Sequence, residues 1–208
     1  QAATLRTPMR ATDATAPRYD TRMARRNSIV VITGPAAVGK MTVGQELSRL
    51  TGMPLLFNHM VVDLVTRFTP FGTPAFHRLA RMFTAELIET AAAEGRGLIL
   101  THALVYSLPN ARPMLEEFVA PFTRRGGDAC FAELAAPLET RLARNGTEHR
   151  ALHKDVAWAT PERLREMEAW GAWQAPGDFA FPGAHIRIDN TDLAPADTAH
   201  RIREAFPL

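Results

Sequence analysis

Cysteine is almost missing from this 208-residue sequence, which contains Cys130 alone. A single thiol cannot form a disulfide within the chain, so the sequence is no disulfide-stabilised secreted scaffold and fits a reducing compartment. Cys130 itself is interpreted as a small buried residue of a strand. Long apolar runs are missing as well, because no stretch approaches the ~20 apolar residues that a membrane-spanning helix needs. We therefore predict a cytoplasmic protein without a membrane partner.

Lysine is the second scarce residue, since Lys40 and Lys154 are its two occurrences among 24 basic side chains. In a chain that otherwise uses arginine, a lysine suggests a position that needs a compact ammonium group. The net charge of +2 is also small, and residues 1–27 contribute six arginines against two aspartates, which leaves −2 for the remainder. The remainder thus gives no electrostatic argument for a nucleic-acid partner.

Residues 1–27 are rich in Ala, Thr, Arg and Pro and have no apolar periodicity, which predicts a disordered leader or tail. The segment lacks the apolar stretch of a secretory signal. Its many arginines and few acids would also suit a transit peptide, but we favour an extension from a vector or an upstream start, with Met23 as the natural initiator. Residues 28–208 are then expected to form one domain.

Strand and helix patterns alternate along that domain. Short apolar runs predict five strands, and longer stretches with helical apolar spacing predict the helices between them. This alternation predicts an α/β fold of three layers, α/β/α, with a parallel five-stranded sheet. The predicted strands are 28–33, 54–57, 98–101, 129–134 and 184–189, and the predicted helices are 40–50, 60–68, 75–94, 110–125, 137–144, 160–170 and 195–206.

The most specific motif is a Gly-x-x-x-x-Gly-Lys loop between the first predicted strand and the first predicted helix. In this frame the backbone N–H groups of the loop surround phosphate at a helix N-terminus, which favours negative charge, and the lysine reaches the β- and γ-phosphates. The sequence therefore predicts a nucleoside triphosphate, ATP, as cofactor. The residues expected to bind it are Gly34, Pro35, Ala36, Ala37, Val38, Gly39, Lys40, Met41 and Thr42.

The position after the lysine departs from the usual motif, in which a Ser or Thr ligates Mg²⁺. Met41 occupies this position and Thr42 follows it. Two interpretations stay open: Thr42 takes over part of the metal-binding role, directly or through water, or it only supports the loop. Mg²⁺ is expected as the second cofactor, with Thr42 as its candidate ligand.

The string Gly39-Lys40-Met41-Thr42 is similar to the Gly-Lys-Gly-Thr of adenylate kinases, and the overall layout resembles the small P-loop kinases of the shikimate and gluconate kinase type. The run 31–44 looks closest to bacterial shikimate-kinase-like ATP-binding proteins without an assigned substrate. The resemblance covers about residues 28–205, but only the phosphate loop is a highly specific match. It implies a P-loop kinase fold with a mobile lid.

The resemblance also implies a lid at about residues 145–159, with arginines that stabilise charge on the phosphoryl group during transfer. Arg144 and Arg150 are favoured over Arg141 and Lys154, and a solvated surface position is the alternative for each. In related kinases a loop after the last strand packs beside adenine. The corresponding candidates here are Asn190, Thr191 and Asp192.

The acceptor is expected beyond the carboxyl end of the second strand, because ligands of parallel α/β sheets bind there. His59 follows this strand, and Asp63 lies one helical turn later on the same face. Shikimate-type kinases carry an aspartate near this strand end, which interacts with the acceptor hydroxyl or with magnesium. We name Asp63 and His59 jointly as catalytic candidates that accept or orient the hydroxyl proton. The alternative is that Asp63 merely caps or solvates a helix.

The third strand ends at Thr101-His102, where many P-loop enzymes have an acidic residue that anchors magnesium. No acid is present, which argues against a standard nucleoside monophosphate kinase and leaves His102 as a candidate substrate contact. In the segment that covers the acceptor in related kinases, aromatic side chains would suit a ring-bearing acceptor and arginines an anionic one, although core packing explains the aromatics equally well. These residues are Phe68, Phe71, Phe76, Arg78 and Arg81.

We predict an ATP-dependent small-molecule kinase that phosphorylates a hydroxyl group, with Lys40 and the lid arginines stabilising the transferred group. Two alternatives stay open: a nucleoside or nucleotide kinase, and a nucleotide-binding regulatory or toxin-like protein that hydrolyses ATP slowly. The expected partner is a small-molecule acceptor, with no nucleic acid, and the expected assembly is a monomer or a homodimer.

Overall fold

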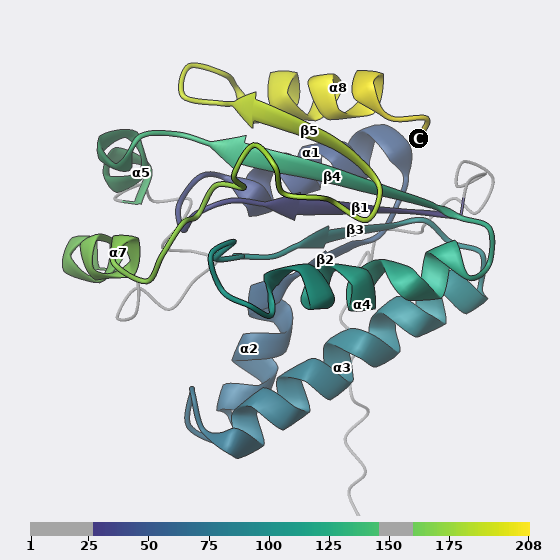
Figure 1. Cartoon of the computed structure of the whole chain (residues 1–208), viewed down its shortest axis with the longest axis horizontal. Coiled ribbons are helices and arrows are strands. Elements are labelled where there is room, and N and C mark those ends of the chain that lie inside the picture. Colours follow the sequence, from purple (N-terminus) through teal and green to yellow (C-terminus); the bar gives the residue numbers. More distant parts are fainter. Residues whose placement is uncertain (1–26, 146–159) are drawn as a thin grey trace, which may run out of the picture.

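The computed structural model describes residues 27–145 and 160–208. In this part of the chain, five parallel strands form one sheet in the order β2-β3-β1-β4-β5, with β1 at its centre (Figure 1). The predicted five-stranded parallel sheet is therefore confirmed. The strands are β1 (Ser28–Thr33), β2 (Leu55–Phe57), β3 (Leu98–Thr101), β4 (Asp128–Ala135) and β5 (Ala184–Asp189).

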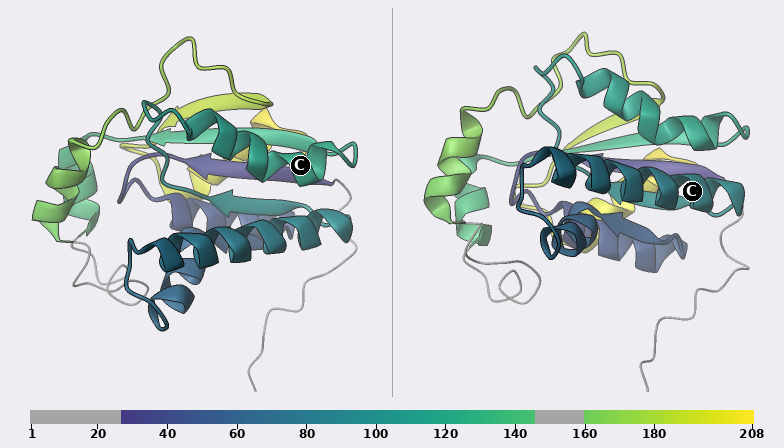
Figure 2. Two further views of the ribbon diagram at one scale, coloured as in Figure 1. Left: turned by 60° about the horizontal axis from the view of Figure 1, so that its bottom comes forward. Right: turned by 90° about the horizontal axis from the view of Figure 1, so that it is seen from below.

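Helices cover both faces of the sheet and complete the three layers (Figure 2). Helices α1 and α8 pack together on one face, whereas α3 and α4 cover the other, and α2 packs against α3. Helices α5 and α7 lie at the end of the sheet to which the strand arrowheads point (Figure 1). The helices are α1 (Lys40–Thr51), α2 (Asn58–Thr66), α3 (Pro74–Ala93), α4 (Ala111–Thr123), α5 (Leu138–Asn145), α7 (Pro161–Glu168) and α8 (Pro195–Ala205).

Strand β1 shows why the sequence of a central strand in this sheet is a continuous apolar run. Successive side chains of a strand point to opposite faces. Ile29 and Val31 belong to the core beneath α3 and α4, while Val30 and Ile32 belong to the core beneath α1 and α8. All four side chains are completely buried. The absence of polar alternation in this strand thus follows from burial on both faces.

Two helices begin with a threonine cap followed by proline, at the predicted position for α7 and one residue before the predicted start for α3. The Thr73 Oγ1 accepts a hydrogen bond from the Phe76 N–H at the head of α3 (3.1 Å). At the head of α7, Thr160 Oγ1 accepts from the Arg163 N–H in the same way (3.2 Å). Each side chain satisfies one N–H group that has no intrahelical partner, and the proline fits the first helical position.

The structure moves some predicted boundaries by one or two residues. One of these changes affects a predicted site residue. Helix α2 begins at Asn58 instead of residue 60, so His59 lies in its first turn. Cys130 is buried in β4, as predicted, and burial raises the pKa of its thiol to about 11. No described helix is both long enough and apolar enough to cross a membrane. The predicted leader and lid lie outside the described residues apart from Asn27 and Asn145.

Candidate functional site

The phosphate loop connects β1 to α1 through backbone in the left-handed region. Gly34 has φ of 131°, Ala37 of 64° and Gly39 of 101°. At Gly34 a Cβ atom would come within 2.4 Å of the Leu134 carbonyl oxygen, so a side chain cannot be accommodated without moving β4. The loop ends at the first turn of α1, where helical N–H groups lack intrahelical partners. This backbone forms a site that favours an anion.

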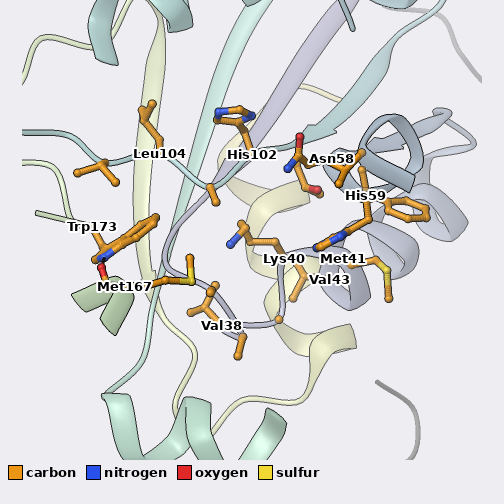
Figure 3. Close-up of a pocket in the computed structure, with 18 of the residues that line it drawn as sticks. Val38, Lys40, Met41, Val43, Asn58, His59, His102, Leu104, Met167 and Trp173 are labelled. Atoms are coloured by element: carbon orange, nitrogen blue, oxygen red, sulfur yellow. Dashed lines mark hydrogen bonds between the residues drawn. The ribbon is translucent and has the colours of Figure 1, made fainter. Parts of the chain in front are cut away.

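The Lys40 ammonium lies over the loop. Its Nζ donates hydrogen bonds to the carbonyl oxygens of Gly34 (2.7 Å) and Pro35 (2.6 Å). Figure 3 shows this side chain extending from the start of α1 into a cavity. Phosphate oxygens bound at the loop would therefore lie within reach of the ammonium.

A cavity of about 890 Å³ opens above the loop. This volume falls in the range of roughly 300–1,000 Å³ that small-molecule sites occupy. The cavity is lined by the loop, the first turns of α1 and α2, the connection from β3 to α4, and residues from α5, α7 and the loop after β5. Figure 3 shows Lys40 between two walls, one with Met167, Trp173 and Leu104 and the other with Asn58 and His59.

Most of the site residues predicted from the sequence line this one cavity. Of the residues predicted for the nucleotide, the metal and catalysis, Gly34, Pro35, Thr191 and Asp192 lie outside the lining, and Arg150 lies outside the described residues. The structure thus brings the predicted nucleotide and acceptor residues together, while their roles stay predictions. The predicted residues that do line the cavity are Ala36, Ala37, Val38, Gly39, Lys40, Met41, Thr42, His59, Asp63, Arg144 and Asn190.

Arg144 connects the phosphate loop to the loop after β5. Its Nη1 donates to the Val38 carbonyl (3.2 Å), and its Nη2 donates to the carbonyls of Asn190 (2.7 Å) and Thr191 (2.9 Å). The Asn190 Nδ2 donates to the same Val38 oxygen (2.9 Å). The guanidinium and the amide together hold these two loops at a fixed separation.

The Asn190 side chain leaves an acceptor without a partner. Its Oδ1 is buried and has no hydrogen bond among the described residues. Such a buried oxygen costs on the order of 1–3 kcal/mol unless a donor reaches it. Next to it, the N–H and the Oγ1 of Thr191 donate to Asp189 Oδ1 (2.9 and 2.6 Å), and these bonds lower the pKa of the Asp189 carboxyl. Thr191 therefore shapes the loop that presents Asn190.

The acceptor candidates stand on α2 and at the end of β3. His59 and Asp63 are four residues apart on one face of α2, and both line the cavity. His102 lies across from His59 in Figure 3, with its ring against Phe118 at a centroid distance of 5.1 Å. Burial, and after it the charge of Lys40, lowers the pKa of His102 to about 4. Its imidazole is therefore neutral at pH 7.

Several lining residues were not predicted from the sequence. Asn58 is one, because the predicted start of α2 was two residues late. Trp173 is another: it is buried, and its Nε1 donates to the Met167 carbonyl (2.9 Å). The sequence Trp-Gly-Ala-Trp at 170–173 was the available signal, since tryptophan side chains in a loop are rarely fully exposed to solvent. The other unpredicted lining residues that form the apolar walls are Leu104, Val105, Leu108, Met114, Leu164, Met167 and Trp170.

A buried carboxylate holds the segment that carries Trp173. Glu133 on β4 is fully buried, accepts from the Ala175 N–H (2.9 Å), and pairs with Arg187 Nε (3.1 Å) and His185 Nε2 (3.2 Å). Arg187 also donates to the Ala175 carbonyl. A glutamate inside the otherwise apolar run 129–135 was the sequence signal for this network. It fixes the 171–183 connection against the sheet, and thereby one wall of the cavity.

The arginines considered for the lid and the acceptor differ in their surroundings. Arg141 is buried outside the cavity lining, bonded to the carbonyls of Ala36 and Ala136 and paired with Glu168 (2.8 Å). Arg81 faces solvent and forms a two-bond pair with Glu117 (3.0 Å for each bond).

Among the described residues, no group of three or more His, Cys, Asp or Glu side chains could hold a metal ion. Mg²⁺ needs less than such a cluster, since one or two protein ligands and phosphate oxygens with water usually suffice. Thr42 and Asp63 both line the cavity and provide oxygen atoms. The site is thus compatible with a magnesium ion that is held mainly by phosphates.

A scan against models of known protein families finds no match to the sequence, and a search of curated proteins finds none either. Solved structures with a similar fold do exist. A sugar kinase from Janibacter matches with a TM-score of 0.53 at 17% identity, covering 85% of this chain and 92% of that one. A gluconokinase from Sinorhizobium meliloti has a TM-score of 0.55 at 16% identity, with 87% and 91% covered.

A shikimate kinase from Acinetobacter baumannii, solved in complex with shikimate, has a TM-score of 0.50 at 18% identity and covers 85% of this chain and 90% of its own. At sequence identities this low, the similarity to these structures shows a shared fold. This chain therefore has the fold of the small P-loop kinases of the shikimate and gluconate type, as the sequence predicted.

Proposed function

We propose that this chain is an ATP-dependent kinase that transfers a phosphoryl group to a hydroxyl of a small molecule. The observation that carries the proposal is that predicted nucleotide and acceptor residues line one shared cavity around Lys40. In the sheet, β2 and β3 lie on one side of β1, and β5 lies on the other. Residues that follow β2 and β3 and residues that follow β5 therefore line opposite ends of the cavity. A phosphate donor and a hydroxyl acceptor can meet above Lys40.

ATP fits the end of the cavity between the phosphate loop and the loop after β5. The loop backbone and Lys40 are suited to the phosphates. The unpartnered Asn190 Oδ1 is suited to an N–H donor of the adenine base, which would remove the unsatisfied acceptor. Thr191 and Asp192 are proposed to border the base from the same loop. When bound, ATP supplies the phosphoryl group.

Mg²⁺ is proposed to bind with the nucleotide. Thr42 would hold it directly or through water, and Asp63 offers a carboxylate on the acceptor side of the cavity. No acid stands at the end of β3, where His102 is neutral, so the metal depends on phosphate oxygens more than in sites with a second acid. This arrangement predicts weak metal affinity without nucleotide.

Asp63 and His59 are proposed to receive the proton of the acceptor. In the transfer, the hydroxyl oxygen forms a bond to the γ-phosphorus as the bond from that phosphorus to the β–γ bridging oxygen breaks. The hydroxyl proton passes to the Asp63 carboxylate or to the His59 imidazole, and the products are a phosphate monoester and ADP. The spacing of the two residues on one face of α2 supports a joint role.

Arg144 and Arg150 are proposed to stabilise the negative charge of the phosphoryl group during its transfer. Arg144 lines the cavity and donates to three loop carbonyls, so reaching the phosphoryl group requires it to exchange at least one of these bonds. Its second role, holding the nucleotide loops together, needs no such exchange.

The test is acceptor-dependent release of ADP from the full chain with ATP and Mg²⁺. Calorimetry with ATP alone first measures nucleotide binding, and a library of hydroxyl compounds is then screened, with phosphorus NMR to identify a phosphate monoester. The proposal expects ATP binding and a monoester from at least one compound class. Lys40→Ala should remove product formation, whereas Arg49→Ala, an exposed α1 residue paired with Glu46, should not.

Two results would contradict the proposal. Failure to bind ATP at millimolar concentration would exclude a nucleotide site altogether. Tight ATP binding with slow hydrolysis that no acceptor accelerates would favour a nucleotide-binding regulatory protein instead.

A further inference from the structure

Most of the large apolar side chains that are exposed gather on two neighbouring helices. Of the nine such side chains among the described residues, seven lie within residues 60–87, on α2, on α3 or in the connection between them. One of the seven, Phe71, lines the cavity, and the other six do not. We call these six the α2–α3 apolar surface: Met60, Leu64, Phe68, Met82, Phe83 and Leu87.

The part of this surface on α2 is separate from the cavity. Met60 and Leu64 are one helical turn apart, and Phe68, four residues further on, is 79% exposed. His59 and Asp63, which line the cavity, form a different row of the same helix. An exposed group of large apolar side chains outside a ligand cavity is typical of a contact with another protein chain.

On α3, two charged side chains flank Met82 at equal distances. Arg78 precedes it by four residues and Glu86 follows it by four, so the three share one row of the helix. Both charged side chains are exposed, and neither forms an ion pair with another described residue. Arg81 and Glu89, by contrast, form ion pairs with α4 and the turn after it. The row through Met82 thus presents one positive and one negative charge to solvent.

We propose that the α2–α3 apolar surface binds a second copy of this chain, with the two α3 helices antiparallel across a two-fold axis near Met82. The proposal is independent of the kinase function. A two-fold contact places the same patch of both copies together, so it must be complementary to itself. In the antiparallel arrangement Arg78 of each copy faces Glu86 of the other, whereas a parallel arrangement in register would place like charges together. The charge pattern of α3 therefore selects the antiparallel dimer.

The apolar side chains complement one another in the same arrangement. Helix α2 packs beside the N-terminal half of α3 (Figure 1). The antiparallel arrangement brings the C-terminal half of the other α3, with Leu87, towards Leu64 and Phe68. The contact removes from water side chains that are 37–79% exposed in the single chain, which stabilises the dimer. It takes no residue from the lining of the cavity.

Charge reversal tests both the contact and its register. Sedimentation equilibrium of the full chain should show a dimer at micromolar concentration. Arg78→Glu alone, or Glu86→Arg alone, replaces both ion pairs with like charges and should raise the dissociation constant at least tenfold. The double variant Arg78→Glu/Glu86→Arg exchanges the two charges and should restore the affinity of the wild type.

Mixing the two single variants gives a sharper measure. A heterodimer of the Arg78→Glu chain with the Glu86→Arg chain contains two pairs of opposite charge, so the mixture should associate as tightly as the wild type, although neither variant does so alone. Arg201→Glu is the matched control, because Arg201 is an exposed residue of α8, on the other face of the sheet. It should leave the dissociation constant unchanged, and circular dichroism checks that every variant folds.

Three results would overturn the inference: a monomer throughout the micromolar range, a dimer that neither single reversal weakens, or a loss that neither the double variant nor the mixture repairs. The first would leave the surface to a partner of another kind. The second would move the dimer contact to another face, and the third would exclude the antiparallel register.

Discussion

Arg144 allows the sharpest test of how this site handles phosphate. Its guanidinium forms three hydrogen bonds, to the carbonyls of Val38, Asn190 and Thr191, at 2.7–3.2 Å. A hydrogen bond to a charged group contributes about 1.5–3 kcal/mol when it is buried, and less here because the side chain is only half-buried. Arg144→Ala therefore loosens the nucleotide loops, and we expect ATP affinity to fall about tenfold, which corresponds to ~1.4 kcal/mol.

The rate should fall further than the affinity. If the guanidinium also contacts the phosphoryl group during transfer, its removal lowers the rate on the order of 10²-fold or more. Arg144→Lys should recover only part of either loss, because an ammonium cannot bond three carbonyls from one planar group. The assays are calorimetry with ATP and single-turnover kinetics with a competent acceptor, and Arg201→Ala, an exposed residue of α8, is the control for lost charge.

The ratio of the two losses decides the role. Equal losses in affinity and rate would mean that Arg144 only holds the loops together in the ground state. No loss in either would refute the functional reasoning altogether and would leave the three bonds as a local structural feature.

Three further predictions follow from buried or charged groups. Lys40→Ala should lower turnover by on the order of 10²-fold or more with an unchanged circular dichroism spectrum, because Lys40 is proposed to bind phosphate and is not a residue of the core. Glu133→Gln should destabilise the fold by about 2 kcal/mol in urea unfolding, since it leaves Arg187 without its buried anion, whereas the exposed Glu46→Gln should change less than about 0.5 kcal/mol. The pKa of His102 is about 4 in the folded chain and about 6.5 in the unfolded chain, so between these pH values only the unfolded chain binds a proton at this residue. The contribution of His102 to the free energy of unfolding is therefore complete above about pH 6.5 and is lost as the pH falls towards 4. Urea unfolding at pH 7.5 and 4.5 should show a smaller difference for His102→Asn than for the wild type, and equal differences would refute that assignment.

The sheet and the phosphate loop could be predicted because their signals are local. A continuous apolar run such as 28–33 means a strand buried on both faces, and Gly34 and Gly39 stand where the backbone adopts positive φ. Thr160, which is followed by proline, marks the start of α7 by itself. In each case the residues that carry the signal lie within one turn or strand of the feature that they determine.

The acceptor end could be predicted only in part, because it forms by packing between distant segments. His59 and Asp63 were found from their spacing after a strand. Trp173 was not, because its place in the cavity depends on the segment that the Glu133 network holds, and this network joins β4 to a connection about 40 residues later. The sequence offered arginines and aromatics for this end with equal weight, and of those five residues the structure places Phe71 in the lining and the other four outside it.

The contacts of the two arginines of α5 could not be predicted from local sequence patterns either, and these contacts connect α5 to the phosphate loop. Arg141 donates to the carbonyl of Ala36 (3.3 Å) and Arg144 to that of Val38 (3.2 Å), both across more than a hundred residues of chain. Partners that are backbone carbonyls leave no trace in side-chain patterns, so the sequence could assign these residues only by resemblance. Because both flank Ala37, any ligand that moves the phosphate loop must also act on α5. In the proposed function, nucleotide binding would thereby be coupled to this helix through two guanidinium groups.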